Sequence, residues 1–212
     1  MCDLRRSWAR IMGSVVAAAL LLAVMTHASP ARRLSVSERN FRDVFAAFTL
    51  FDQATTINIE CPLTLEGSFH SSTYAKVLAA LIGHITRAVA NHPACSGGML
   101  TALIDNLPWA YGYQGFEGSL PSLPGWWIAI RGIGVRAELG FGVVCDYQAS
   151  SSPPSLRIQR EARGGQTVTS WVRGTAIPLV EGGISCPPEV EFGGAAEHTR
   201  LGNTRPVEVT LI

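Results

Sequence analysis

The sequence predicts an all-β fold, an antiparallel β-sandwich or barrel with room for one short helix. Three observations favour it: apolar and polar residues alternate in several stretches, glycines and prolines separate those stretches, and the N-terminus reads as an export signal. The chain has 212 residues with 21 glycines and 12 prolines, enough for one domain or at most two with many turns. Hydrophobic residues make up 47% and charged residues 16%, which excludes an intrinsically disordered chain.

Residues 1–28 have the order of a secretory signal peptide. Arginines near the start precede an apolar run from Ile11 to Met25, and small residues follow it. This run is shorter than the roughly 20 residues of a membrane-spanning helix, so we expect cleavage rather than an uncleaved anchor. Cleavage after Ala28 is expected, with cleavage after Ala31 as the alternative, and no transmembrane span then remains. The protein is therefore expected to be secreted or to reside in the cell envelope.

Removing the signal peptide leaves 14 basic and 15 acidic residues. This balance gives no basic signal for nucleic-acid binding, so we expect no nucleic-acid partner. The remainder divides into an N-terminal segment, residues 29–55, and a β-rich domain, residues 56–212.

Four cysteines remain after the leader: Cys61, Cys95, Cys145 and Cys186. They are widely spaced and contain no C-x-x-C pair, which argues against a structural zinc site. In an exported protein they predict two disulfides, and the sequence leaves all three pairings open.

The clearest strand runs from Thr56 to Phe69, where apolar residues occupy odd positions and polar residues even ones. Pro62 lacks an N–H donor, so we expect this strand to lie at a sheet edge or to bulge there. Trp126 to Leu139 reads as one strand with a β-bulge at Arg131-Gly132, because the apolar phase changes there.

Other segments give weaker strand and turn signals. We expect strands over Leu107–Tyr113 and Phe141–Tyr147, and at the C-terminus around Val207–Leu211. We expect a hairpin formed by Leu156–Arg163 and Gln166–Arg173. Turns are expected at Gly182-Gly183 and Gly193-Gly194. Residues 37–51 and 74–90 fit helical spacing, and in both a strand remains an alternative to a helix.

The sequence contains no motif of a known catalytic site. It lacks G-x-S-x-G, H-E-x-x-H and a phosphate-binding glycine loop. Its mature histidines have no i, i+2 or i, i+4 partner, so no metal site and no cofactor are expected. Glu60 and Glu66 lie about 20 Å apart on one strand, too far for a glycosidase pair.

Aromatic residues are the best candidates for a binding site. Trp109, Tyr111 and Tyr113 share one face of a strand, as either a buried core stripe or a stacking surface for sugar rings. Adjacent strand residues face opposite ways, so Trp126 is expected inside and Trp127 outside with Arg131. An exposed tryptophan marks a partner site unless a loop or a second sheet covers it.

Three segments carry a resemblance: Cys61–Ser71 (CPLTLEGSFHS), Leu107–Trp109 (LPW) and Gly115–Pro121 (GFEGSLP). They resemble a group of exported bacterial β-rich proteins with no assigned function. The resemblance spans Phe41 to Ile212 and implies an exported, disulfide-containing β domain without catalytic residues to transfer.

Our leading hypothesis is a non-enzymatic domain that binds an extracellular partner or surface polymer through the aromatic residues near Trp127. An exported hydrolase assembled from distant residues, for example His70 with a serine or a glutamate, is the alternative. A purely structural envelope component is the third hypothesis.

Overall fold

The computed structural model describes residues 33–212, except residues 53, 56, 118–124, 150–154, 161–166 and 172–175. The predicted signal peptide and both cleavage sites lie outside the described residues. Within these, regular structure consists of strands and short 3-10 turns, so the all-β prediction is confirmed and neither uncertain segment forms the short helix. No helix in the described part of the chain is long and apolar enough to cross a membrane.

The elements follow one another along the chain with short connections. Their bounds are β1 Leu34–Val36, β2 Asn40–Phe51, β3 Asn58–Phe69, β4 Thr73–Tyr74, β5 Leu81–Ala90, η1 His92–Ala94, β6 Met99–Ala102, η2 Ile104–Asn106, β7 Trp109–Glu117, β8 Gly125–Arg131, β9 Gly134–Glu138, η3 Gly140–Gly142, β10 Val144–Gln148, β11 Ser155–Arg160, β12 Thr167–Trp171, β13 Ala176–Gly182, β14 Glu189–Arg200 and β15 Val209–Leu211.

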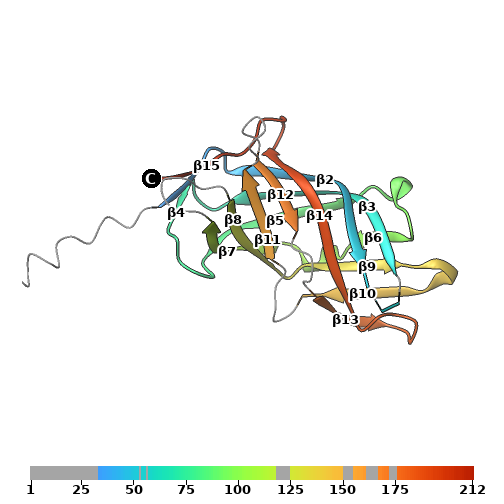
Figure 1. Ribbon diagram of the computed structural model, residues 1–212. Helices are drawn as coiled ribbons and strands as arrows, with labels where there is room; N and C mark the ends of the chain where they lie inside the picture. Colours follow the sequence, from blue (N-terminus) through green and yellow to red (C-terminus); the bar gives the residue numbers. More distant parts are fainter. Residues whose placement is uncertain are drawn as a thin grey trace, which may run out of the picture. The chain divides into compact units, whose positions relative to one another are not determined.

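Eight of the described strands form a closed ring (Figure 1). The antiparallel pairs run β2-β3-β5-β7-β8-β11-β12-β14, and β14 pairs with β2 to close the ring. Strands that neighbour each other in this ring also follow one another in chain order, which is the up-and-down arrangement of a barrel. A separate small sheet has the order β15-β1-β4.

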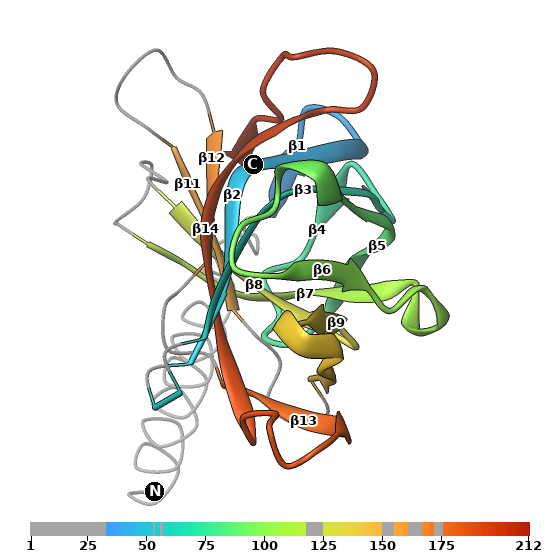
Figure 2. The same ribbon diagram turned by 90° about the vertical axis from the view of Figure 1, so that its right-hand side faces the viewer.

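Strand β14 belongs to two parts of the structure. Its first residues pair with β13 and its later residues with β12, as the long strand in Figure 2 shows. From β13 the sheet continues through β10 and β9 to β6. The hydrophobic core includes residues of these strands as well as of the ring, among them Val135 and Ala137 of β9 and Cys145 and Tyr147 of β10.

Alternation along β3 places its odd residues in the core. Ile59, Cys61, Leu65 and Phe69 are fully buried, while the even residues between them are exposed or half-buried. Pro62 does not lie at an edge, because β3 is paired with β2 on one side and β5 on the other. It lies opposite the bulge between Phe45 and Phe48 of β2. The regular ladder of hydrogen bonds is interrupted at a bulge, so the strand pair does not need an N–H donor from Pro62 there.

The two segments with helical spacing are the strands β2 and β5. A bulge between Phe45 and Phe48 advances the phase of β2, so its buried phenylalanines acquire helix-like intervals. In β5 a register shift lies opposite Glu66 and Gly67, and it leaves Ile82, Ile85 and Ala88 buried at intervals of three. Bulges thus reproduce a helical pattern in extended chain.

Two sequence expectations about turns and bulges are wrong. Trp126 to Leu139 is two strands, because Gly132, with φ of 83°, turns the chain from β8 in the ring to β9 beside β10. Gly193-Gly194 lies inside β14 instead of at a turn. A Cβ on Gly194 would lie 2.8 Å from the Ala47 carbonyl oxygen. Glycine at this position therefore allows β14 and β2 to lie close together.

Residues of the N-terminal segment join the same body as the β-rich domain. Residues 33–212 form one compact unit, and β1 and β2 lie within its two sheets. The boundary drawn between residues 55 and 56 falls in the connection between β2 and β3.

Candidate functional site

One row of cross-strand neighbours crosses five strands on the outside of the ring. It consists of Asn40, Ser68, His84, Ala110 and Arg131. Directly opposed residues on adjacent strands point to the same side of a sheet, and Ser68 alternates with the buried Phe69. The row therefore faces outward, and the sequence-predicted Arg131 stands exposed at its end.

A second outward row contains an ion-pair network. Arg42 Nε and a terminal nitrogen of Arg42 lie 2.9 and 2.8 Å from Glu66 Oε1, and Arg87 lies 3.0 Å from Glu66 Oε2. Burial by itself raises the pKa of Glu66, but hydrogen bonds and charges from Arg87 and Arg42 outweigh burial and hold that pKa below its ordinary value.

The two rows carry more positive than negative charge. They contain three arginines, Arg42, Arg87 and Arg131, and one carboxylate, that of Glu66. Both arginines of the network keep solvent-exposed surface, with side chains 39% and 59% exposed for Arg42 and Arg87. We call this set, with Trp127, the arginine face; it is a curved surface that extends from β2 through β3, β5 and β7 to β8, halfway around the ring of eight strands.

Trp127 lies on the same face of β8 as Arg131, four residues before it, which is about 13 Å along the strand. Its side chain is half-buried, whereas Trp126 is buried at 4% exposure. Its neighbour across the β7–β8 pair is Gly115, and a Cβ added there would meet nothing within 4 Å. A side chain at position 115 would therefore have room beside β8.

The three other aromatic candidates lie in the core. Trp109, Tyr111 and Tyr113 are 1%, 0% and 3% exposed. Burial raises the pKa of the Tyr111 hydroxyl well above its ordinary value, and the charge of Asp43 raises it further. These rings offer no stacking surface, and they pack the barrel interior instead.

The structure brings His70 and His84 together, although 14 residues separate them in the sequence. His70 Nε2 and His84 Nδ1 lie 2.8 Å apart, with His70 exposed and His84 half-buried. Spacing rules missed this pair because strand register, and not local spacing, creates it. The hydrolase hypothesis predicted a serine or a glutamate beside the His70 ring. Among the described residues, the His70 ring is hydrogen-bonded to His84.

A second hidden pair is Asp43 with His198. Their side chains are fully buried, and Asp43 Oδ1 lies 2.5 Å from His198 Nδ1. The His198 ring packs against Phe41 and Phe69, with centroids 5.1 and 6.3 Å away. Asp–His pairs occur in catalytic sites, but complete burial removes this one from solvent and favours a structural role.

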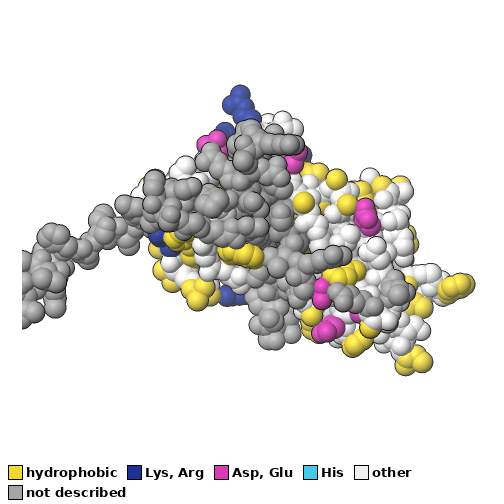
Figure 3. All heavy atoms as spheres, viewed as in Figure 1, with side chains coloured by type: hydrophobic (Ala, Val, Ile, Leu, Met, Phe, Trp, Pro, Cys, Tyr) yellow, Lys and Arg dark blue, Asp and Glu magenta, His cyan; other side chains and the backbone are white. Residues whose placement is uncertain are grey.

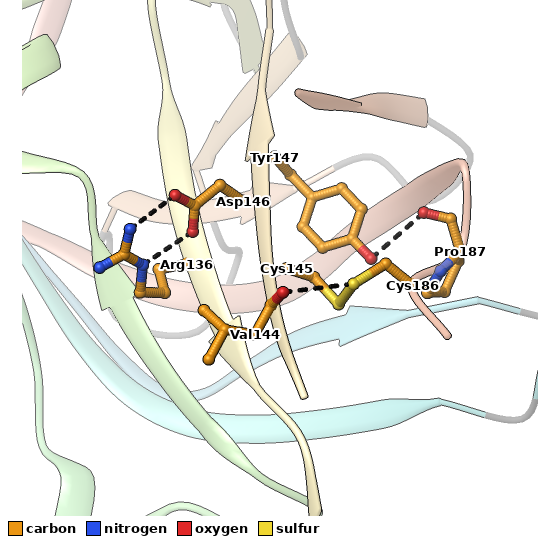
Figure 4. The surroundings of a disulfide bond; sticks show 7 residues. All are labelled: Arg136, Val144, Cys145, Asp146, Tyr147, Cys186 and Pro187. Atoms are coloured by element: carbon orange, nitrogen blue, oxygen red, sulfur yellow. Dashed lines mark hydrogen bonds and ion pairs between the residues drawn. A yellow bond between two sulfur atoms is a disulfide. The ribbon is translucent and has the colours of Figure 1, made fainter. Parts of the chain in front are cut away.

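The end of the molecule near β10 is built around a disulfide (Figure 4). Cys145 is bonded to Cys186 and Cys61 to Cys95, which selects one of the three pairings. Beside the first bond, Arg136 makes two hydrogen bonds to Asp146, at 2.8 and 2.7 Å, and the Tyr147 hydroxyl donates to the Pro187 carbonyl oxygen at 3.3 Å.

A pocket of about 180 Å³ lies where β2 ends and β14 begins, and it contains three carboxylates, Asp52, Glu189 and Glu191. The Asp52 carboxylate already accepts hydrogen bonds from the backbone N–H groups of Ala54 and Thr55. This bonding belongs to the turn between β2 and β3, so the pocket gives no separate indication of a ligand.

Several apolar side chains of the described residues are exposed. In the view of Figure 3 they stand at separate places over the described surface. Phe141 and Ile184 are the most exposed, and each lies at the tip of a connection between strands.

Comparison of this chain with protein-family models, curated proteins and solved structures finds no match.

Proposed function

We propose that this protein is a non-catalytic binding domain that acts outside the cytosol and holds an anionic surface polymer on the arginine face. The observation that carries the proposal is the excess of arginine over carboxylate in the two outward rows described above, in a chain that is nearly neutral overall. Such a face attracts acidic groups and repels basic ones.

The geometry of the arginine face suits an extended anionic chain. Glu66 holds the two guanidinium groups of Arg42 and Arg87 in fixed positions while leaving part of each exposed. A planar guanidinium binds carboxylate, sulfate or phosphate oxygens with two parallel hydrogen bonds. Arg131 adds a third such group farther along the sheet.

Trp127 supplies a contact that charge alone does not. A half-buried indole offers its remaining apolar surface to a sugar ring or another flat apolar group of the polymer. The face therefore combines charge attraction with one stacking position, which favours an acidic polysaccharide over a small inorganic anion.

The two disulfides support an oxidising compartment. Bonds between Cys61 and Cys95 and between Cys145 and Cys186 persist in secreted and envelope proteins and are rare in the cytosol. Together with the predicted signal peptide, they support the proposal that the polymer is one found at the cell surface.

Dextran sulfate, with neutral dextran as its matched control, tests the proposal by titration calorimetry at several salt concentrations. We expect salt-sensitive binding to dextran sulfate alone. Arg87→Gln and Arg131→Gln should each weaken it about three- to tenfold, since one charge contact contributes on the order of 1 kcal/mol. Trp127→Ala should weaken binding with little change in salt dependence.

Arg136→Gln is the matched charge control, because Arg136 lies in β9, outside the ring, and bonds Asp146. It should leave binding unchanged in protein whose melting temperature shows that it is folded. Absence of binding to dextran sulfate, or equal losses for Arg136→Gln and Arg131→Gln, overturns the proposal.

A further inference from the structure

The two imidazoles at the end of β3 and the start of β5 are held in place by the backbone. The His70 N–H donates to the Ile82 carbonyl oxygen at 2.9 Å, which fixes His70 beside β5. The rings of His70 and His84 then lie 4.7 Å apart between centroids, with an angle of 50° between their planes. The backbone therefore presents two imidazole nitrogens at one place on the surface.

The facing nitrogens are His70 Nε2 and His84 Nδ1, 2.8 Å apart. In a pair of neutral imidazoles, one of these nitrogens donates the single shared proton and the other accepts it. When the protons lie instead on His70 Nδ1 and His84 Nε2, both facing nitrogens offer lone pairs to the same point. Neutral imidazole nitrogens are preferred ligands of Zn²⁺ and Cu²⁺.

We propose that His70 and His84 form a two-imidazole binding site for a divalent transition-metal ion, with Cu²⁺ bound more tightly than Zn²⁺. Metal–imidazole bonds of about 2.0–2.1 Å place the two nitrogens roughly 2.9 Å apart in the square-planar geometry of Cu²⁺ and roughly 3.3 Å apart in the tetrahedral geometry of Zn²⁺. The observed separation of 2.8 Å is close to the value for Cu²⁺, whereas Zn²⁺ requires the rings to move apart by about 0.5 Å, for which the exposed His70 side chain has room to rotate.

The site leaves coordination positions open. Within the described part of the chain no group of three or more metal-binding side chains gathers, so the protein offers two ligands here. Water or an oxygen donor of a bound molecule completes the coordination, as in metal sites that keep an open position. This inference rests on imidazole geometry and is independent of the proposed polymer binding.

Titration of the full-length, disulfide-bonded protein with Cu²⁺ alone tests the inference. We expect His70→Gln and His84→Gln each to weaken Cu²⁺ binding at least tenfold. His92→Gln is the matched control, because His92 is also exposed but contacts Thr101, at 3.2 Å, instead of another imidazole; it should bind as the wild type does.

Electron paramagnetic resonance gives a second readout that a general loss of stability would not produce. Bound Cu²⁺ should show two imidazole nitrogens in the wild type and one in either variant. Unchanged affinity in His70→Gln and His84→Gln, or an equal loss in His92→Gln, overturns the assignment. Melting temperatures measured without metal establish that each variant is folded.

Discussion

Asp43 and His198 are direct cross-strand neighbours, and they join the first and last long strands of the ring inside the hydrophobic core. The residues are 155 positions apart, and their side chains have no exposed surface. The Asp43 carboxylate and the His198 Nδ1 meet in only one register of β2 against β14. The pair therefore favours the register that closes the barrel.

Removing one member of this pair should destabilise the protein strongly. His198→Ala leaves the Asp43 carboxylate buried without its imidazole, and we expect a loss of about 3–5 kcal/mol in the free energy of unfolding. Urea denaturation measures it. In a double-mutant cycle with Asp43→Leu and His198→Leu, the double variant should lose less than the two single losses combined. Additive losses would show that the two side chains do not interact.

The substitution Gly67→Ala should also destabilise the fold. A Cβ at Gly67 would lie 2.3 Å from the His84 carbonyl oxygen and 2.7 Å from the Phe41 ring, so β3 and β5 must move apart. We expect a loss of about 2–3 kcal/mol, the size of an overpacked core. Gly140→Ala is the matched control, because a Cβ there meets nothing within 4 Å. Equal urea midpoints for the two variants would contradict this packing.

Acid should destabilise the protein partly through Glu66. The pKa of this carboxyl is held below its ordinary value of 4.5, so its ion pairs stabilise the fold above that pH. The contribution is lost as pH falls through the lower pKa of the folded state. Glu66→Gln should cost about 1 kcal/mol at pH 7 and flatten the fall in stability below about pH 4.5.

The exposed Glu60→Gln is the control for this pH dependence. Thermal unfolding followed from pH 7 to pH 3 should give the same slope for Glu60→Gln as for the wild type. If Glu66→Gln also keeps the wild-type slope, the network around Glu66 does not stabilise the fold.

Each disulfide should stabilise the chain by closing a long loop. The bonded cysteines are 34 and 41 residues apart, which corresponds to about 4 kcal/mol per bond when loop entropy alone is counted. The double substitution Cys145→Ser with Cys186→Ser should lower the urea midpoint accordingly. Peptide mapping under non-reducing conditions should recover Cys61 with Cys95, and a Cys61–Cys145 peptide would refute the pairing.

Several features of this protein could be read from local sequence. Alternation along residues 56–69 places Ile59, Cys61 and Leu65 on a buried face, and Gly164-Gly165 predicts the hairpin of β11 and β12. Such patterns depend on neighbours one or two positions away, because strand geometry has a period of two. The all-β class follows from such patterns, and the two disulfides follow from the four cysteines that remain after the leader.

Register and partners are decided by contacts between distant residues. The bulge in β2 gives a strand the residue spacing of a helix, and Gly132 divides one predicted strand into two. Trp109, Tyr111 and Tyr113 are buried in the core. Three groups of side chains form only through contacts between strands: the network of Arg42, Glu66 and Arg87, the pair His70 and His84, and the pair Asp43 and His198. A shift of one residue reverses the face that every side chain occupies, so only the folded sheet settles which of these groups come together.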